Sequence, residues 1–131
     1  MKQKLAVLVL QSRTAGLGLN LSSWHSSVKI IKAMNPKVSL VINQLKPYKP
    51  EKIILFGSYA QGTNSAESDV DLVLIKKTTQ PYDKRLKKVR MLLSTTTPVD
   101  VFVFTPKEFK DGAKKNLFLA EISKTGKVIY E

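Results

Sequence analysis

The chain has 131 residues, 43% hydrophobic and 24% charged, which is typical of one globular domain and excludes a disordered chain. Its formal net charge of +12 favours an anionic partner or substrate, such as a nucleic acid, a polyphosphate or an acidic protein surface. Cysteine is absent and His25 is the single histidine, so disulfides, thiolate nucleophiles, Cys/His zinc sites and most histidine-based triads are excluded. Any chemistry must rest on carboxylates, hydroxyls, lysines or bound metal.

The sequence divides near Met34. Met1–Ala33 mixes short apolar stretches with serine, threonine and glycine without sustained periodicity, and the first acidic residue of the chain is Glu51. We interpret residues 1–33 as an N-terminal extension and residues 34–131 as the folded domain. One hypothesis is that Met34 is the natural start of the protein. The alternative is an ordinary helix over Leu21–Met34 that packs on the core.

Neither secretion nor membrane insertion is expected. Met1–Leu10 has some features of a signal peptide, but its apolar run Leu5–Leu10 is short and continues into Gln11-Ser12-Arg13. No apolar run approaches the roughly 18 residues that a membrane helix needs. We therefore expect a cytoplasmic protein without a membrane partner.

From Asn35 onward the chain alternates between helix and strand patterns. Asn35-Pro36 is typical of a helix start, and this helix is expected to stop at Pro47–Pro50. The expected strands are Lys52–Phe56, Val70–Ile75, Pro98–Phe104 and Val128–Tyr130. Further helices are expected over Tyr82–Leu93, after a capping box at Thr105–Glu108, and over Leu117–Ile122 as far as Gly126. This order predicts an α+β (mixed α/β) fold with a mixed sheet of about four strands flanked by helices.

Three aspartates lie in or beside the predicted strands. Asp69 and Asp71 are two residues apart, so the period of a strand places both carboxylates on one face. Asp100 lies in the next apolar strand, and neighbouring strands are about 4.8 Å apart. Like charges this close repel one another and need a compensating cation, for which Mg²⁺ is the natural choice. The three carboxylates therefore predict a metal site.

A glycine loop follows the first predicted strand. Gly57 lets backbone N–H groups approach a phosphate closely, Ser58 adds a hydroxyl donor, and Gly62 closes the loop. A short helix through Tyr59 and Ala60 is expected here. A triphosphate held at this loop and bridged by metal to the carboxylates suits nucleotidyl transfer.

Three motifs carry a family resemblance. Gly57-Ser58-Tyr59-Ala60-Gln61-Gly62, Ser68-Asp69-Val70-Asp71-Leu72 and Val99-Asp100-Val101 resemble the signature of the polymerase-β-type nucleotidyltransferase superfamily, and specifically its minimal nucleotidyltransferases. The resemblance covers about Pro36–Glu131 and implies the nucleotidyltransferase fold. Many relatives carry arginine where this chain has Gln61, so a phosphate contact is lost at that position.

The resemblance also assigns roles to the site residues. Asp69 and Asp71 would bind two catalytic metal ions, Mg²⁺ or alternatively Mn²⁺. Asp100 would complete the catalytic metal site and help to deprotonate the acceptor. Gly57 and Ser58, with Gly62 in the same loop, would bind the nucleotide triphosphate.

Minimal nucleotidyltransferases are commonly paired with HEPN-domain proteins (higher eukaryotes and prokaryotes nucleotide-binding) in toxin–antitoxin systems. The resemblance thus implies an antitoxin that transfers AMP from ATP to a tyrosine of a HEPN partner. The alternative is an inactive binding module that neutralises its partner by contact, which Gln61 and the small size favour. Nucleic-acid binding is a third possibility but is not favoured. We expect Lys84, Arg85, Lys87, Lys88 and Arg90 to form a solvated helix face rather than a docking surface.

Overall fold

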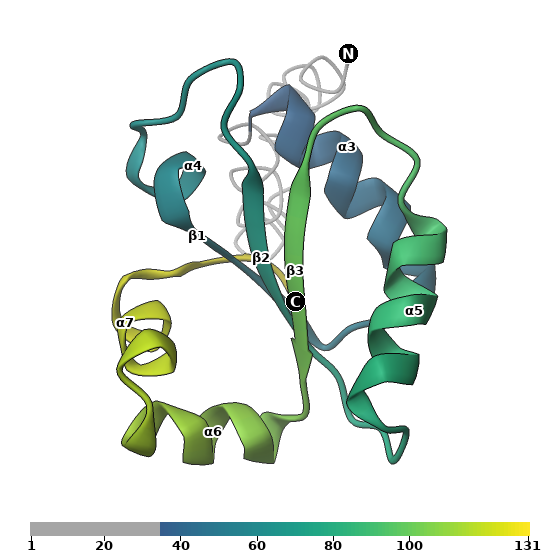
Figure 1. The fold of residues 1–131 in the computed structure, drawn as a ribbon, viewed down its shortest axis with the longest axis vertical. Coiled ribbons are helices and arrows are strands. Elements are labelled where there is room, and N and C mark those ends of the chain that lie inside the picture. The colour runs from purple at the N-terminus through teal and green to yellow at the C-terminus, as the bar shows by residue number, and fades with distance from the viewer. Residues whose placement is uncertain (1–34) are drawn as a thin grey trace, which may run out of the picture. The chain divides into compact units, whose positions relative to one another are not determined.

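The computed structural model describes residues 35–131, so the interpretation of residues 1–33 and the alternative helix over Leu21–Met34 lie outside the described part. Helices and strands alternate along this part of the chain (Figure 1). The helices are α3 Pro36–Leu45, the 3₁₀ helix η1 Lys46–Tyr48, α4 Gly57–Gln61, α5 Tyr82–Leu92, α6 Pro106–Lys115 and α7 Leu117–Thr125. The strands are β1 Lys52–Phe56, β2 Val70–Ile75, β3 Val99–Phe104 and β4 Lys127–Tyr130.

The four strands form one mixed sheet in the order β3-β2-β1-β4, which confirms the predicted fold class. β1 pairs antiparallel with both β2 and β4, whereas β2 and β3 are parallel. Parallel neighbours need a crossover connection, and α5 supplies it between β2 and β3. The two central strands are rich in Ile, Leu and Val because both of their faces are covered.

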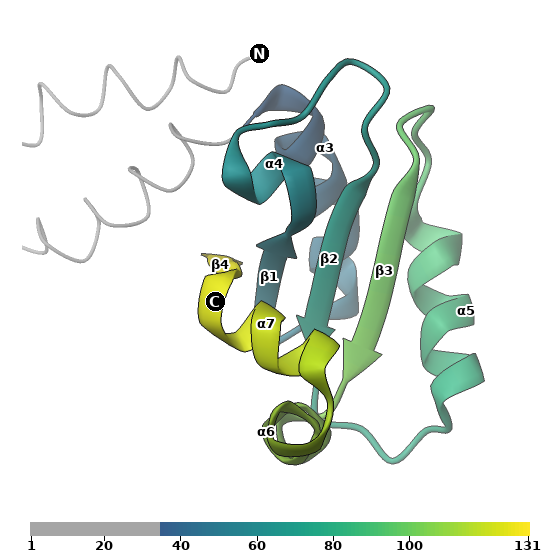
Figure 2. The ribbon, with the colours of Figure 1, turned by 60° about the vertical axis from the view of Figure 1, so that its left-hand side comes forward.

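Helices cover both faces of the sheet (Figure 2). On one face, Leu119 and Ile122 of α7 form a core with Ile54, Val73 and Ile75 of the two central strands. On the other face lie α5 and the part of α3 from Leu40 onward (Figure 2). Val41, Leu45, Leu72, Leu74, Val89 and Val103 are among the fully buried side chains.

The predicted elements are confirmed with small shifts at their ends. β3 begins at Val99 instead of Pro98, because Pro98 lacks the N–H that a strand would use. The capping box before α6 is present in full, with both Thr105 and Glu108 bonded as expected. Asn116 interrupts the last helical region, since its side chain accepts from Phe118 N and Leu119 N and so starts α7 as a separate helix.

The prediction for Arg85 is wrong: it is not part of a solvated face. Arg85 is 6% exposed, because it shares the inward face of α5 with Val89, four residues later. Its guanidinium donates to both carboxylate oxygens of Glu108, at 2.7 and 3.2 Å, and to the carbonyl of Val103 at 3.2 Å. Arg85 therefore ties α5 to β3 and α6. Lys84, Lys87, Lys88 and Arg90 are exposed, as expected.

The outer edge of β3 is covered at Val103. The backbone N–H of Val103 donates to the Tyr82 hydroxyl at 3.4 Å, and its carbonyl accepts from Arg85. Both side chains come from the first turn of α5. Within residues 35–131, no helix is long and apolar enough to cross a membrane.

Glu108→Gln is expected to lower the free energy of unfolding by about 2 kcal/mol, because a buried guanidinium then loses its charged partner. Arg85 lowers the pKa of Glu108 from 4.5, so the difference between variant and wild type should shrink as the pH falls below that value. Urea denaturation at pH 7 and pH 4 measures both effects. Asp111→Asn is the control, since Asp111 pairs with Lys107 at the exposed surface and should change stability little. Equal effects of the two substitutions would contradict this account.

Candidate active site

The register of the sheet places two of the predicted carboxylates together. Asp71 is the second residue of β2 and lies opposite Phe56 of β1 and Asp100 of β3. Paired residues of neighbouring strands share a face, so the two aspartates lie side by side on the face that α7 covers farther along. Asp69 precedes β2 and is exposed, as is Asp100, whereas Asp71 is half-buried. Asp71 and Asp100 therefore lie within strands, whereas Asp69 lies in the loop before β2.

Asp71 experiences a strongly unfavourable environment for a negative charge. Its pKa is raised from 3.8 to about 6, first by burial and then by the charges of Asp100 and Asp69. A hydrogen bond with the Asp100 side chain raises the pKa further. Two carboxyl groups that share a hydrogen bond cannot both ionise without cost, so this pair favours either a proton or a cation.

The chemistry of these groups fits a hard divalent cation. Carboxylate oxygens are the ligands that Mg²⁺ prefers, and a cation beside Asp71 and Asp100 would remove the repulsion that raises the Asp71 pKa. Within residues 35–131, no three acidic or histidine side chains are grouped closely enough to form a ready-made metal site. The structure thus brings Asp71 and Asp100 together, while Asp69 acts on Asp71 through its charge alone.

Gly57 lies directly against Asp71. Its φ of +73° is a left-handed conformation that favours glycine, and a Cβ added there would clash with Asp71 Oδ2. Ser58 follows in the first turn of α4, so the start of this helix is adjacent to the carboxylates. The structure therefore places Gly57 and Ser58 beside the predicted metal ligands.

Gly62 and Gln61 lie at the other end of α4. Gly62 has a φ of +76° and its N–H donates to the carbonyl of Ser58, which ends the helix. This left-handed conformation alone explains a glycine there, because a Cβ would meet nothing within 4 Å. A contact of Gly62 with nucleotide stays a prediction. Gln61 is exposed at the last position of α4.

An aromatic wall that no sequence pattern predicts adjoins Asp71 and Asp100, and it is formed by Phe56, Phe102 and Phe118. Phe56 lies opposite Asp71, and Phe102 follows Asp100 by two residues on the same face. The Phe118 ring lies 5.7 Å from that of Phe56 and 5.6 Å from that of Phe102. Phe118 is 47% exposed, so this wall offers an aromatic surface to a ligand. The only signal in the sequence for this aromatic wall is a pair of apolar residues, Leu117 and Phe118, directly after the helix cap Asn116.

Asp71→Asn is expected to raise the Tm in EDTA above pH 6. The folded state binds the Asp71 proton more tightly than the unfolded chain, so the ionised carboxylate destabilises the fold at higher pH. The difference should disappear as the pH falls toward 4, and Mg²⁺ should raise the Tm of the wild type but not of the variant. Thermal unfolding monitored by circular dichroism measures these shifts, with Glu67→Gln in the exposed preceding loop as control. If the Tm of Asp71→Asn at pH 8 were below that of the wild type, charge repulsion at Asp71 would not be destabilising the fold.

This chain is similar to known proteins over most of its length. Residues 39–131 match the family described as polymerase beta, nucleotidyltransferase. A Methanocaldococcus jannaschii protein named "putative protein adenylyltransferase" is 27% identical over 99 residues, which cover 76% of this chain and 94% of the relative. The crystal structure of a "putative nucleotidyltransferase" from Sulfolobus solfataricus shares 22% identity, covers 72% of this chain and 82% of its own, and gives a TM-score of 0.47. The family match spans both the Gly57–Gly62 loop and the aspartates, and the chain belongs to the polymerase-β nucleotidyltransferase family.

Proposed function

We propose that this nucleotidyltransferase transfers AMP from ATP to a hydroxyl group, and that the acceptor is a tyrosine of a HEPN-domain toxin that it neutralises. The observation that carries the transferase site is the Asp71–Asp100 pair, with Gly57 directly against Asp71. Nucleotidyl transfer requires carboxylates that can hold a metal ion and a backbone that a phosphate can approach closely. The two aspartates and Gly57 supply these parts.

The residues have distinct roles in this reaction. Asp69, Asp71 and Asp100 would hold Mg²⁺, which neutralises phosphate charge and makes the acceptor hydroxyl more acidic when bound. Gly57 and Ser58 would hold the triphosphate. The acceptor oxygen forms a bond to the α-phosphorus, and the bond from that phosphorus to the oxygen bridging to the β-phosphate breaks. Pyrophosphate leaves, and the hydroxyl proton passes to Asp100.

Two observations support a protein tyrosine as the acceptor. The Methanocaldococcus relative bears the name of a protein adenylyltransferase, and it aligns over nearly its whole length. The half-exposed Phe118 ring, with Phe56 and Phe102 behind it, offers a tyrosine ring a stacking surface next to the carboxylates.

The transferase proposal is tested by incubating the protein with α-phosphate-labelled ATP, Mg²⁺ and a HEPN-domain protein from the same organism. Label should appear on a HEPN tyrosine, located by mass spectrometry. Asp71→Asn should reduce the rate at least a hundredfold, about 2.7 kcal/mol of barrier, because phosphate charge is then poorly neutralised. Glu67→Gln in the preceding loop is the matched control and should keep the rate. If both variants were to label the partner at equal rates, Asp71 would have no role in the transfer reaction.

Phe118→Ala is expected to raise the KM for the tyrosine-bearing partner about tenfold while kcat falls little, because the exposed ring supplies binding area and no reacting group. Steady-state labelling at varied partner concentration separates the two constants. Leu117→Ala is the control, since Leu117 is the more exposed neighbour, at 89%. If Leu117→Ala raises KM as much, general surface contact and not ring stacking explains the effect.

A second candidate is a binding module that neutralises its partner by contact. Gln61 in place of an arginine and the exposed position of Asp69 outside β2 favour it. The double variant Asp69→Asn/Asp71→Asn separates the two functions in cells that express the toxin. A contact-only module should still protect these cells, whereas a transferase should not.

A further inference from the structure

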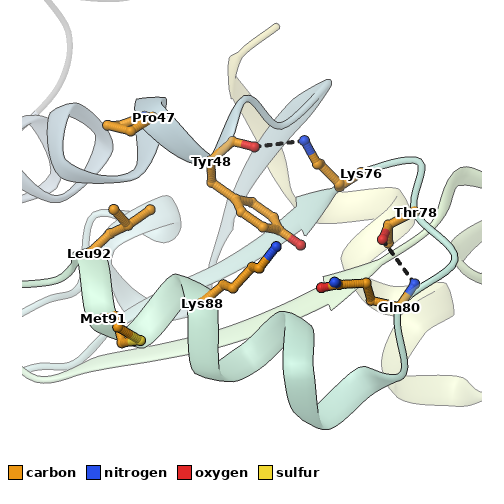
Figure 3. A pocket seen from close by; sticks show the side chains of 8 residues that line it. All are labelled: Pro47, Tyr48, Lys76, Thr78, Gln80, Lys88, Met91 and Leu92. Carbon is orange, nitrogen blue, oxygen red and sulfur yellow. Dashed lines mark hydrogen bonds between the residues drawn. The ribbon is translucent and has the colours of Figure 1, made fainter.

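A pocket of about 510 Å³ lies at the opposite end of β2 from the carboxylates (Figure 3). Lys76, which lines it, follows the last residue of β2, whereas Asp71 is near the first. Lys76 lies five residue steps beyond Asp71, which is roughly 16 Å along an extended chain. The pocket is therefore separate from the candidate active site. Pro47, Lys88 and Met91 of its lining are exposed, so the pocket is an open depression at the surface.

The walls of the pocket are held in place by hydrogen bonds. Lys76 Nζ donates to the carbonyls of Tyr48 and Lys49, at 2.7 and 3.3 Å, and lies 4.9 Å from the centre of the Tyr48 ring. On the other side, the Gln80 carbonyl accepts from the Nε of buried Arg85 at 2.8 Å. The Gln80 N–H donates to Thr78 Oγ1 at 3.1 Å. These bonds pre-form the pocket in the absence of any ligand.

Three polar groups in the pocket remain available to a ligand. The side chains of Tyr48, Gln80 and Lys88 point toward one another in Figure 3. Within the described chain, the structure shows no hydrogen bond or ion pair for the Tyr48 hydroxyl, the Gln80 carboxamide or the Lys88 ammonium group. Burial raises the pKa of Tyr48, so its hydroxyl stays a neutral donor. All three groups can donate hydrogen bonds to one anion.

Charge and shape together indicate the chemical class of the ligand. Two lysines and no carboxylate line the pocket, so an anionic group is favoured. The rest of the lining, Pro47, Met91 and Leu92, is apolar and suits an organic body. Lysine is a common point-charge partner of phosphate.

We propose that this pocket binds a nucleoside monophosphate. Its phosphate is bound by Lys88, Tyr48 and Gln80, and its base lies against Pro47, Met91 and Leu92. The site does not depend on the proposed transferase activity, because none of these residues contacts the carboxylates.

The test is calorimetric titration of AMP, in EDTA, into the Asp69→Asn/Asp71→Asn variant, whose candidate active site is disabled while the pocket is intact. AMP should bind with one-to-one stoichiometry. Adding Lys88→Ala should weaken binding at least tenfold, because a charge-assisted hydrogen bond is lost. Adding Lys87→Ala, which removes the same charge from an exposed neighbour outside the pocket, should change binding less than twofold.

Three results would overturn the proposal. They are no AMP binding to the variant with the intact pocket, equal weakening by Lys87→Ala and Lys88→Ala, and inorganic phosphate binding as tightly as AMP. The last result would leave a phosphate site without a role for the nucleoside. Tyr48→Phe is a milder second probe that keeps the ring over Lys76, and it should weaken AMP binding severalfold while the fold, followed by circular dichroism, is unchanged.

Discussion

The register of β2 between its two neighbours is the constraint on which the candidate active site depends. It sets Asp71 opposite Phe56 on one side and Asp100 on the other. A slip of one residue would turn Asp71 to the opposite face and bury it among helices. Leu72 and Leu74 prevent this slip, because both are completely buried on that opposite face. Apolar packing on one side of the sheet therefore maintains the chemistry on the other.

The candidate active site contains two features that are unfavourable for a folded chain. Gly57 adopts a left-handed conformation against a carboxylate, and Asp71 is partly buried beside a second acid. Neither feature stabilises a folded chain. Such exceptions concentrate at functional sites, where the geometry serves a ligand instead of the fold. The well-packed strands around the site provide the stability that allows them.

Local signals predicted the elements and the motif residues, whereas contacts between distant segments could not be predicted. The capping box at Thr105–Glu108 and the strand Lys52–Phe56 depend on neighbouring residues, and both are confirmed. The sequence predicts Arg85 on a solvated face because its partner Glu108 is 23 residues away, and no local pattern indicates an ion pair. The contacts of Phe118 with Phe56 and Phe102 likewise follow from how α7 folds back on the sheet, which periodicity does not show.

The contacts at Val103 have a consequence for self-association. β3 is an edge strand, and an unpaired edge is a template for strand addition by another chain. Tyr82 and Arg85 occupy both the N–H and the carbonyl of Val103, so an incoming strand finds no partner there. The first turn of α5 thus blocks the addition of another strand to β3 at Val103. This role is separate from holding the helices together.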